Sequence, residues 1–480
     1  MVTKTVYKQI RGFVAIWLSI TFVMGLSTFL AIYFTYNPSA VDPGSSNPLP
    51  LGLLAPAPPE EASAPAIVLP SVTPEPTSTP TAVTPEATVP VMAYEATDVP
   101  TLTNTPEPSP TPTLLPVVDM RYQIGIQVEH APDFNPDNQE AWYRSVASDL
   151  GINWVKQQVR WELMEPEQGQ IDWSALDLIM PSAEKYAIKL LLSIVTAPDW
   201  AREPGAVLER QGPPADPQVY ADFVAAILKR YPGRIHAIEI WNEQNIDREW
   251  TSVNGLSAGE YVKLLQSAYE TIKSIEPGII VISGALSPTG INDGVGAIDD
   301  FNYMDQLIDA GMLEWADCVG AHHNGYNIGP DFRYNEIADD PDASFRGPFD
   351  NPHHSWSFRS TLEGYANRVR AAGTDTKLCV TKFGWPSAED LEGLRAGFEF
   401  AYDNTLEEQA QWIPQAMSNM ADWDFVWLAF IWNFNYGPQA GWSVENDNVP
   451  YSLIGPGFNF RPAYDAIRAW QREYQAHAGS

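Results

Sequence analysis

Three consecutive stretches decide the fold of this chain: KLLLSIV at Lys189–Val195, VYADFVAAILKR at Val219–Arg230 and IHAIEIW at Ile235–Trp241. The first and third are short, continuous apolar runs, which predict strands that are buried on both faces. The second places apolar residues at helical spacing, which predicts an amphipathic helix. A strand, a helix and a strand in this order imply parallel pairing, because the helix returns the chain across the sheet.

The same alternation continues on both sides of these stretches and defines one globular domain over residues 119–480. Eight strand–helix units predict an α/β protein whose parallel strands close into a (β/α)8 TIM barrel. A doubly wound open sheet is the alternative, but such a sheet usually carries a Gly-rich phosphate loop after an early strand, and this sequence has none. The other predicted strands are Tyr122–Val128, Asn153–Val159, Ile279–Ser283, Cys318–His322, Leu378–Thr381 and Phe425–Trp432, and the other predicted helices are Ala175–Tyr186, Ala258–Ile275, Tyr303–Ala310, Thr361–Ala371, Leu406–Met420 and Ala463–Tyr474.

The first 36 residues have the pattern of a membrane anchor. Residues 1–11 contain Lys4, Lys8 and Arg11, and residues 12–36 form an apolar run without a charged residue. That run is long enough to cross a bilayer as a helix, and the positive charge before it predicts a cytoplasmic N-terminus. We therefore expect a single-pass signal anchor in the cell membrane, with the barrel on the extracellular side. A cleaved signal peptide is the alternative, although its apolar region would be shorter.

Residues 37–118 repeat Thr or Ser, Pro and Glu, and they contain no Lys or Arg. Such a Pro/Thr/Glu-rich segment cannot bury enough apolar surface to offset the entropy of folding, so we expect a disordered linker. Frequent proline favours an extended chain. The linker would hold the barrel away from the membrane.

The composition of the whole chain favours some partners over others. Lys and Arg number 28 against 60 Asp and Glu, a formal net charge of −32, which repels nucleic acid and favours uncharged partners such as carbohydrates. No motif indicates a cofactor or a metal, since the acidic run Asp339–Asp342 lacks a recognised calcium-ligand spacing. The two cysteines, Cys318 and Cys379, are expected to be buried free thiols, with a single disulfide as the alternative. We expect the barrel to be monomeric.

The functional residues of a (β/α)8 barrel follow the C-terminal ends of its strands. In this sequence those positions are rich in carboxylates, amides and aromatic residues, and aromatic rings are common platforms for sugar rings. The stretches are Glu129-His130, Arg160-Trp161, Thr196–Trp200, Asn242-Glu243, His322-His323, Lys382–Trp385 and Trp432–Tyr436.

Four motifs in chain order carry a resemblance to a known group of enzymes. They are WELMEP at Trp161–Pro166 with IDW at Ile171–Trp173, WNE at Trp241–Glu243, TKFGW at Thr381–Trp385 and IWN at Ile431–Asn433. Over about residues 121–475 the sequence resembles the clan A glycoside hydrolases, in particular families 5 and 39. The resemblance implies a barrel that hydrolyses O-glycosidic bonds of a β-linked oligo- or polysaccharide, with water as the only co-substrate and no cofactor.

The resemblance also implies roles for single residues. Glu243 corresponds to the general acid/base, and Asn242 beside it would hydrogen-bond the sugar 2-hydroxyl. The alternative for Glu243 is a carboxylate that only caps a helix or pairs with an arginine. Asn324 stands where the family often has a tyrosine, for which Tyr326 is the candidate replacement. The candidate substrate-binding residues are Asn242, His322, Arg160, Trp161, Trp200, Tyr326, Trp385 and Trp432.

The second catalytic carboxylate is missing from its expected place. A retaining glycosidase needs two carboxyl groups about 5–5.5 Å apart. The resemblance puts the nucleophile at position 382, which is lysine in this sequence. A lysine there lowers the pKa of a neighbouring Glu243, whereas a general acid needs a raised pKa. We keep Lys382 as a candidate catalytic residue together with Glu243.

Three explanations of this lysine remain open. In the first, another carboxylate activates water in an inverting arrangement, which spaces the two carboxyl groups about 6.5–9.5 Å apart. In the second, the barrel is an inactive relative that binds carbohydrate, with Lys382 in a salt bridge to Glu243. In the third, Lys382 forms a Schiff base, although no phosphate-binding motif accompanies it. The candidates for the other carboxylate are Glu389, Asp390, Glu445 and Asp447.

Overall fold

A computed structural model describes residues 120–478 of the chain. The predicted cytoplasmic segment (1–11), membrane helix (12–36) and linker (37–118) lie outside the described residues. Within 120–478, no helix combines the length and the apolar character needed to cross a membrane.

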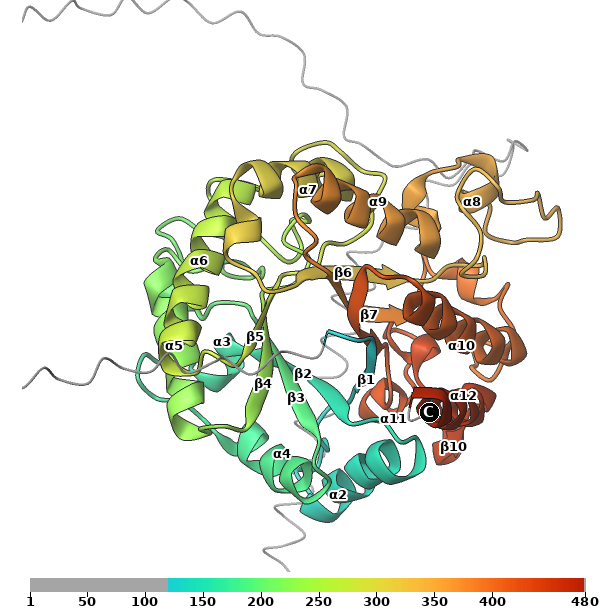
Figure 1. Cartoon of the computed structure of the whole chain (residues 1–480), viewed down its shortest axis with the longest axis horizontal. Coiled ribbons are helices and arrows are strands. Elements are labelled where there is room, and N and C mark those ends of the chain that lie inside the picture. Colours follow the sequence, from blue (N-terminus) through green and yellow to red (C-terminus); the bar gives the residue numbers. More distant parts are fainter. Residues whose placement is uncertain (1–119, 479–480) are drawn as a thin grey trace, which may run out of the picture. The chain divides into compact units, whose positions relative to one another are not determined.

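Eight parallel strands form the centre of the molecule, in the order β5-β4-β3-β2-β1-β8-β7-β6. Two isolated parallel bridges, which pair Ile282 with Cys318 and Leu286 with Ala321, join β5 to β6 and close the sheet. Figure 1 shows the helices in a ring around these strands. The fold is therefore a (β/α)8 barrel, as the sequence predicts. The strands are β1 (Gln123–Gln127), β2 (Trp154–Arg160), β3 (Lys189–Val195), β4 (Ile235–Ile240), β5 (Ile280–Ser283), β6 (Val319–Asn324), β7 (Leu378–Gly384) and β8 (Val426–Ile431).

Most outer helices lie where helical periodicity places them. Their starts are fixed by side chains that accept a backbone N–H of the first turn, such as Asp216, Ser257 and Thr405, which satisfies donors that have no partner inside a helix. The periodicity misses α2 (Pro136–Arg144), because its sequence PDNQEAWYR is largely polar. The other long helices are α4 (Ser174–Lys185), α5 (Pro217–Arg230), α6 (Ala258–Ile275), α7 (Asp300–Asp309), α9 (Phe358–Ala371), α10 (Leu406–Asp422) and α12 (Pro462–Ala478), and the short elements are α3 (Trp161–Met164), α8 (Gly347–Asp350), α11 (Tyr436–Gln439) and the antiparallel pair β9 (Ile454–Gly455) and β10 (Asn459–Phe460).

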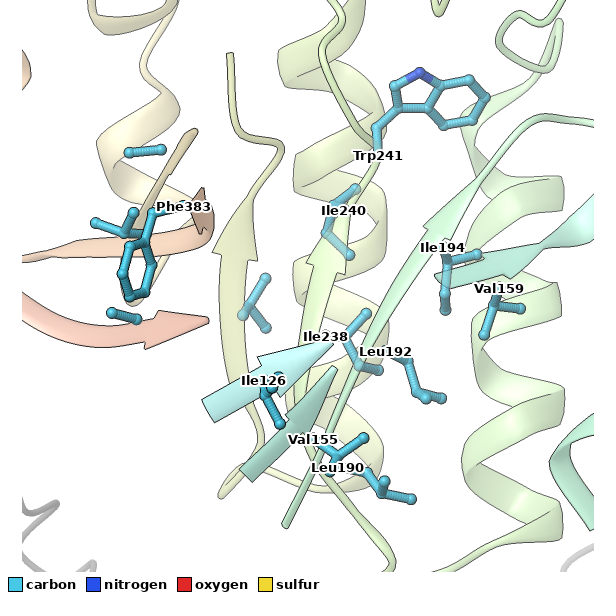
Figure 2. Packing of buried hydrophobic residues seen from close by; sticks show 14 of the residues in the cluster. Ile126, Val155, Val159, Leu190, Leu192, Ile194, Ile238, Ile240, Trp241 and Phe383 are labelled. Atoms are coloured by element: carbon cyan, nitrogen blue, oxygen red, sulfur yellow. The ribbon is translucent and has the colours of Figure 1, made fainter. Parts of the chain in front are cut away.

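The strands are apolar on both faces because each face is covered. One set of side chains packs against the helices in a large cluster that includes Ile126, Leu190, Leu192 and Ile194, and Figure 2 shows part of this cluster. The alternate set fills the barrel interior. This packing explains why the strands appear in the sequence as continuous apolar runs and not as alternating ones. The interior set includes Trp154, Leu191, Ala237, Ile282, Leu428 and Phe430.

The two cysteines form a disulfide, so the expectation of free thiols is wrong. Cys318 lies directly before β6 and Cys379 lies in β7, and their Cα atoms are 5.8 Å apart. Both side chains belong to the interior cluster. In the register of the two strands Cys379 pairs with Gly320, two residues after Cys318, so the disulfide joins diagonal neighbours, and a single sequence does not reveal this register.

Candidate active site

A cavity of about 600 Å³ opens at the C-terminal ends of β4, β7 and β8. We call it the cleft. Its polar lining includes Asn242, Glu243, Arg248, Glu249 and Lys382. Aromatic side chains from several loops complete its walls, as expected for a site that binds sugar rings. These side chains are Tyr326, Phe345, Trp356, Phe400, Trp432 and Tyr436.

Glu243 is the third residue after β4 and has its carboxylate in the cleft. Its backbone N–H donates to the carbonyl of Ala285 at 2.8 Å. Its φ of 49° lies in the left-handed region, which a residue with a side chain adopts only where its surroundings impose it. The carboxylate Oε1 is 2.9 Å from His322 Nδ1 and 3.9 Å from Lys382 Nζ, and Oε2 is 3.4 Å from Arg248 Nη2. Two cations and an imidazole thus surround one carboxylate.

This environment keeps Glu243 ionised. Burial by itself raises the pKa of the carboxyl group, but the charge of Lys382, the hydrogen bond from His322 and the charge of Arg248 outweigh it. The pKa of Glu243 therefore lies well below its usual range. An ionised carboxylate has no proton to give, so Glu243 in this state is a base or a nucleophile and not a general acid.

His322 lies in β6 behind Glu243 and is 1% exposed. Burial, with the nearby charge of Lys382, lowers its pKa to about 4, so the imidazole is neutral. Because an ionised carboxylate can only accept, the His322 proton is on Nδ1 and points to Glu243. The residue does not line the cleft, which corrects its assignment to substrate binding. It positions the carboxylate instead.

Lys382 lies in β7 and lines the cleft. Its Nζ donates to Asn242 Oδ1 at 2.8 Å and lies 4.7 Å from the centre of the Trp432 ring. An amide oxygen, a carboxylate and an aromatic face all stabilise an ammonium ion. These contacts are those of a charged lysine and not of an amine that attacks a carbonyl. The Schiff-base explanation of Lys382 thus gains no support from the geometry.

A second Lys–Glu pair lies deeper in the barrel and was missed in the sequence. Lys156 Nζ is 2.7 Å from Glu239 Oε2, and the Thr381 hydroxyl donates to Glu239 Oε1 at 2.5 Å. Burial, partly offset by the charge of Glu239, lowers the pKa of Lys156 to about 8. Lys156 and Glu239 lie inside strands, two positions after the interior residues Trp154 and Ala237, so strand alternation directs both side chains to the barrel axis.

Glu249 is a further carboxylate of the cleft that the sequence analysis missed. It lies in the loop between β4 and α6, and its Oε1 is 3.3 Å from Arg248 Nε. Burial and the charge of Glu243 raise the pKa of Glu249. Glu243 and Glu249 therefore bind two nitrogens of one guanidinium, with pKa shifts of opposite direction. Its position in the loop that follows β4, six residues after Glu243, is the signal that could have indicated it.

The four candidates for the second catalytic carboxylate differ in whether they line the cleft. Asp447 lines the cleft. Asp390 pairs with Arg461 at 2.5 Å, and Glu389 accepts the backbone N–H of Leu406 at 2.6 Å. Glu445 does not line the cleft. Asp447 is therefore the member of this set that shares a cavity with Glu243.

Some of the predicted aromatic residues line the cleft, and others are packed inside the barrel. Tyr326 and Trp432 line the cleft. Trp161 and Trp385 are 0% and 1% exposed, and Trp200 packs edge-on against Trp161 with its indole N–H on the carbonyl of Glu165. These three pack the barrel and do not face the cleft, contrary to the expectation. Arg160 likewise turns to Glu162, with 2.6 Å from Nε to Oε1, and lines a separate pocket.

Comparisons with known proteins agree with the barrel. The family model Glyco_hydro_42, described as Beta-galactosidase, matches residues 132–204. The match runs from the segment before α2 to the loop after β3 and includes the Trp161–Pro166 motif. No curated protein sequence matches the chain.

Solved structures of glycoside hydrolases have the same fold. A family 39 glycoside hydrolase from the gut symbiont Bacteroides cellulosilyticus WH2 has a TM-score of 0.52 and 20% identity over 73% of this chain and 64% of its own. A glucosidase from Croceicoccus marinus has a TM-score of 0.50 and 14% identity over 75% of this chain and 69% of its own. This chain thus spans less than two thirds of the family 39 enzyme. At these identities the likeness is one of fold, the (β/α)8 barrel.

Proposed function

We propose that the barrel is a glycoside hydrolase that cleaves a β-linked oligo- or polysaccharide in the cleft. The observation that carries the proposal is the Glu243 carboxylate, held by His322 and Arg248 at the end of β4 in a cleft with aromatic walls. The resemblance of the WNE motif to the acid/base motif of clan A supports it. So do the short family 42 match and the fold shared with glycoside hydrolases.

The substrate class follows from the cleft lining. Aromatic faces such as Trp432 and Tyr436 stack on the C–H faces of sugar rings, and the amide and carboxylates hydrogen-bond hydroxyl groups. The acidic chain, with a net charge of −32, disfavours phosphate-rich ligands. Water is the only co-substrate, and no cofactor or nucleic acid takes part.

For the mechanism we propose that Glu249 is the general acid and Glu243 the ionised partner. Pairs of carboxylates whose environments move their pKa values apart divide the acid and base roles in this way. Both carboxylates contact the guanidinium of Arg248, Glu249 at 3.3 Å and Glu243 at 3.4 Å. The distance between the two carboxyl groups is therefore limited by the width of this one guanidinium group and the two contacts. That spacing is compatible with the carboxyl separations of about 5–9.5 Å that glycosidases use.

The reaction then balances as a hydrolysis. Glu249 gives its proton to the glycosidic oxygen as the bond from that oxygen to the anomeric carbon breaks. Glu243 takes a proton from water as the water oxygen bonds to the anomeric carbon. Lys382 binds the oxygen of the Asn242 amide, which lies against Glu249. Lys382 thereby orients the acid instead of replacing a nucleophile.

Saccharide binding without hydrolysis is the second candidate function. Lys382 favours it, because the lysine occupies the position of the nucleophile and lowers the pKa of Glu243. In this case the cleft binds the same class of saccharide, and the aromatic walls supply most of the affinity.

Kinetics on aryl β-glycosides, soluble β-glucans and xylan, together with calorimetry on the same polymers, separates these candidates. The hydrolase proposal expects turnover by the natural protein and its loss in Glu243→Gln, with Glu167→Gln as an exposed control. Binding without turnover, and turnover gained in Lys382→Glu, establishes the binding protein. Neither binding nor turnover on the whole panel overturns both.

The acid role of Glu249 has its own test. Glu249→Gln is expected to slow hydrolysis of substrates with poor leaving groups by about 10²–10³-fold. Dinitrophenyl glycosides need no proton on the departing oxygen, so their hydrolysis should change little. An equal loss on both substrates, or the leaving-group effect in Glu243→Gln instead, contradicts the assignment.

We also propose that residues 12–36 anchor the chain in the cell membrane and that residues 37–118 hold a monomeric barrel on the extracellular side. The charge pattern around residues 12–36 supports this orientation. The Cys318–Cys379 disulfide supports it as well, because such bonds persist in oxidising compartments. Protease added to intact cells should release the barrel in soluble form. A barrel that is cut only after lysis would contradict the orientation.

A further inference from the structure

A second cluster of polar side chains lies outside the cleft, between α7 and the loop before α9. Asp299 and Asp300 stand at the start of α7, and His353 and His354 stand in the loop that leads to α9. Figure 1 shows α7 and α9 as neighbours beyond β6. The Phe301 ring stacks on His354, with centroids 3.5 Å apart. This packing brings together residues that are more than 50 positions apart in the chain.

The nitrogen and oxygen atoms of the cluster converge. Asp299 Oδ2 is 3.5 Å from His353 Nε2 and 3.9 Å from His354 Nε2, and these three ligand atoms all lie within 4.8 Å of one another. Asp300 Oδ1 is 3.0 Å from His354 Nε2. Bonds of about 2.0–2.2 Å to a tetrahedral zinc ion separate its ligand atoms by about 3.3 Å. Small movements of these side chains would therefore bring the ligand atoms to the spacing of a tetrahedral zinc site.

One atom of the cluster is buried without a hydrogen-bond partner. Asp299 is 7% exposed, and its Oδ1 accepts the N–H groups of Phe301 and Asn302 as the cap of α7. Its Oδ2 has no hydrogen-bond partner and faces the two histidines. A buried carboxylate oxygen in this state is costly unless something binds it. The cap leaves Asp299 fixed in place with one oxygen free to bind a ligand.

Both carboxylates of the cluster are buried beside histidines. Asp299 and Asp300 are both buried, and in the part of the chain described here their ion-pair partners are histidines, with no lysine or arginine. The rings of His353 and His354 are 4.1 Å apart, so a single ion can reach both imidazoles and the carboxylates beside them.

We propose that Asp299, His353 and His354 bind one divalent transition metal, with Asp300 as the fourth ligand. Two imidazoles and two carboxylates fit Zn²⁺, whereas Ca²⁺ and Mg²⁺ prefer ligand sets made of oxygen alone. The sequence analysis predicts no metal, because the two aspartates and the two histidines lie on different units of the barrel. The proposal does not depend on the hydrolase function.

Neighbouring groups hold the side chains of the cluster in place. His353 Nδ1 lies 2.9 Å from the Ser355 hydroxyl and accepts the Ser355 backbone N–H at 3.3 Å. The Tyr365 hydroxyl donates to Asp300 Oδ2 at 2.7 Å, and the backbone N–H of Thr289 donates to Asp300 Oδ1. Such partners fix ligand orientation. Trp356, in the same loop, lines the cleft. The metal thus fixes the loop that forms one wall of the cleft, as a structural ion.

Titration of the chelator-treated protein with ZnCl2 by calorimetry tests the proposal. We expect one equivalent of Zn²⁺ to bind and CaCl2 at the same concentration to give no signal. Saturating Zn²⁺ should raise the melting temperature by about 3–6 °C. Absence of stoichiometric Zn²⁺ binding by the natural protein, or preferred binding of Ca²⁺, overturns the proposal.

Matched variants locate the site. Asp299→Asn keeps an oxygen that caps α7 and replaces the free oxygen by an NH2 group, which cannot bind a metal. We expect this variant and His353→Gln to lose Zn²⁺ binding by at least 10-fold while circular dichroism stays unchanged. His477→Ala, an exposed histidine far along the chain, should bind as the natural protein does. Equal loss in His477→Ala, or none in Asp299→Asn, contradicts the site.

Discussion

Among the described residues the barrel contains two buried Lys–Glu pairs whose geometries differ. In the inner pair, Lys156 and Glu239 are both 0% exposed and lie 2.7 Å apart. In the outer pair, Lys382 and Glu243 are each 8% exposed and lie 3.9 Å apart. The inner charges satisfy each other. In the outer pair the lysine donates to Asn242 and the glutamate binds His322 and Arg248, so both charges remain directed at the cleft. The short contact in the inner pair indicates a structural role. The longer contact in the outer pair leaves both charged groups able to interact with a ligand.

The largest expected effect on stability comes from breaking the inner pair. Lys156→Met leaves Glu239 buried and unpaired, which costs about 3–5 kcal/mol of the free energy of unfolding. Lys382→Met is the matched change in the outer pair and should cost less than about 1 kcal/mol, because Glu243 keeps His322 and Arg248. Urea unfolding of both variants measures the difference. Equal losses would remove the distinction between the two pairs.

A pH effect comes from His322, which lies between the two carboxylates, 2.9 Å from Glu243 and 3.8 Å from Glu239. Its pKa is lowered to about 4, against about 6.5 in the unfolded chain, so the unfolded state binds more protons between these values. The free energy of unfolding should therefore fall by about 2–4 kcal/mol as the pH falls from 6.5 to 4.

His322→Gln is the control for this pH effect. The amide keeps a donor for Glu243 but does not titrate, so the part of the slope due to the imidazole should disappear. Stability of the natural protein and of the variant, measured in urea at several pH values, gives the comparison. Parallel curves would show that the carboxylates alone set the slope.

The smallest effect concerns Trp432, whose ring faces the outer lysine at 4.7 Å. Trp432→Ala should weaken saccharide binding about 3–10-fold through loss of one stacking face. Trp200→Ala removes an indole that does not line the cleft and should leave the affinity unchanged. Calorimetry with a soluble β-glucan reads both. A larger loss in Trp200→Ala would place the sugar elsewhere.

The sequence predicts the barrel well because buried parallel strands leave a strong signal. The strand Lys189–Val195 has its predicted bounds, since a run that is apolar on both faces stands out from any helical pattern. The helix Pro136–Arg144 was missed because its stability comes from packing and from the cap by Asn135, not from periodicity.

The site was predictable only in part. Position at a strand end led to Asn242, Glu243 and Lys382, which line the cleft. The same rule selected Trp161 and Trp385, which are buried, because the rule gives the level of a residue and not the direction of its side chain. Glu249 and the His353-His354 cluster lie in loops. The path of a loop depends on tertiary contacts, and no periodic pattern in a single sequence reveals these contacts.

The hydrogen bond from His322 to Glu243 crosses the seam at which the barrel closes. Glu243 follows β4, His322 lies in β6, and β5 between them is joined to β6 by two isolated bridges. This side-chain hydrogen bond thus links β6 to the end of β4, across the junction between β5 and β6 that two isolated bridges close. A ligand that draws the Glu243 carboxylate away from the His322 imidazole breaks this hydrogen bond. Hydrogen exchange of the backbone amides in β5 and β6 should then be faster when the cleft is occupied.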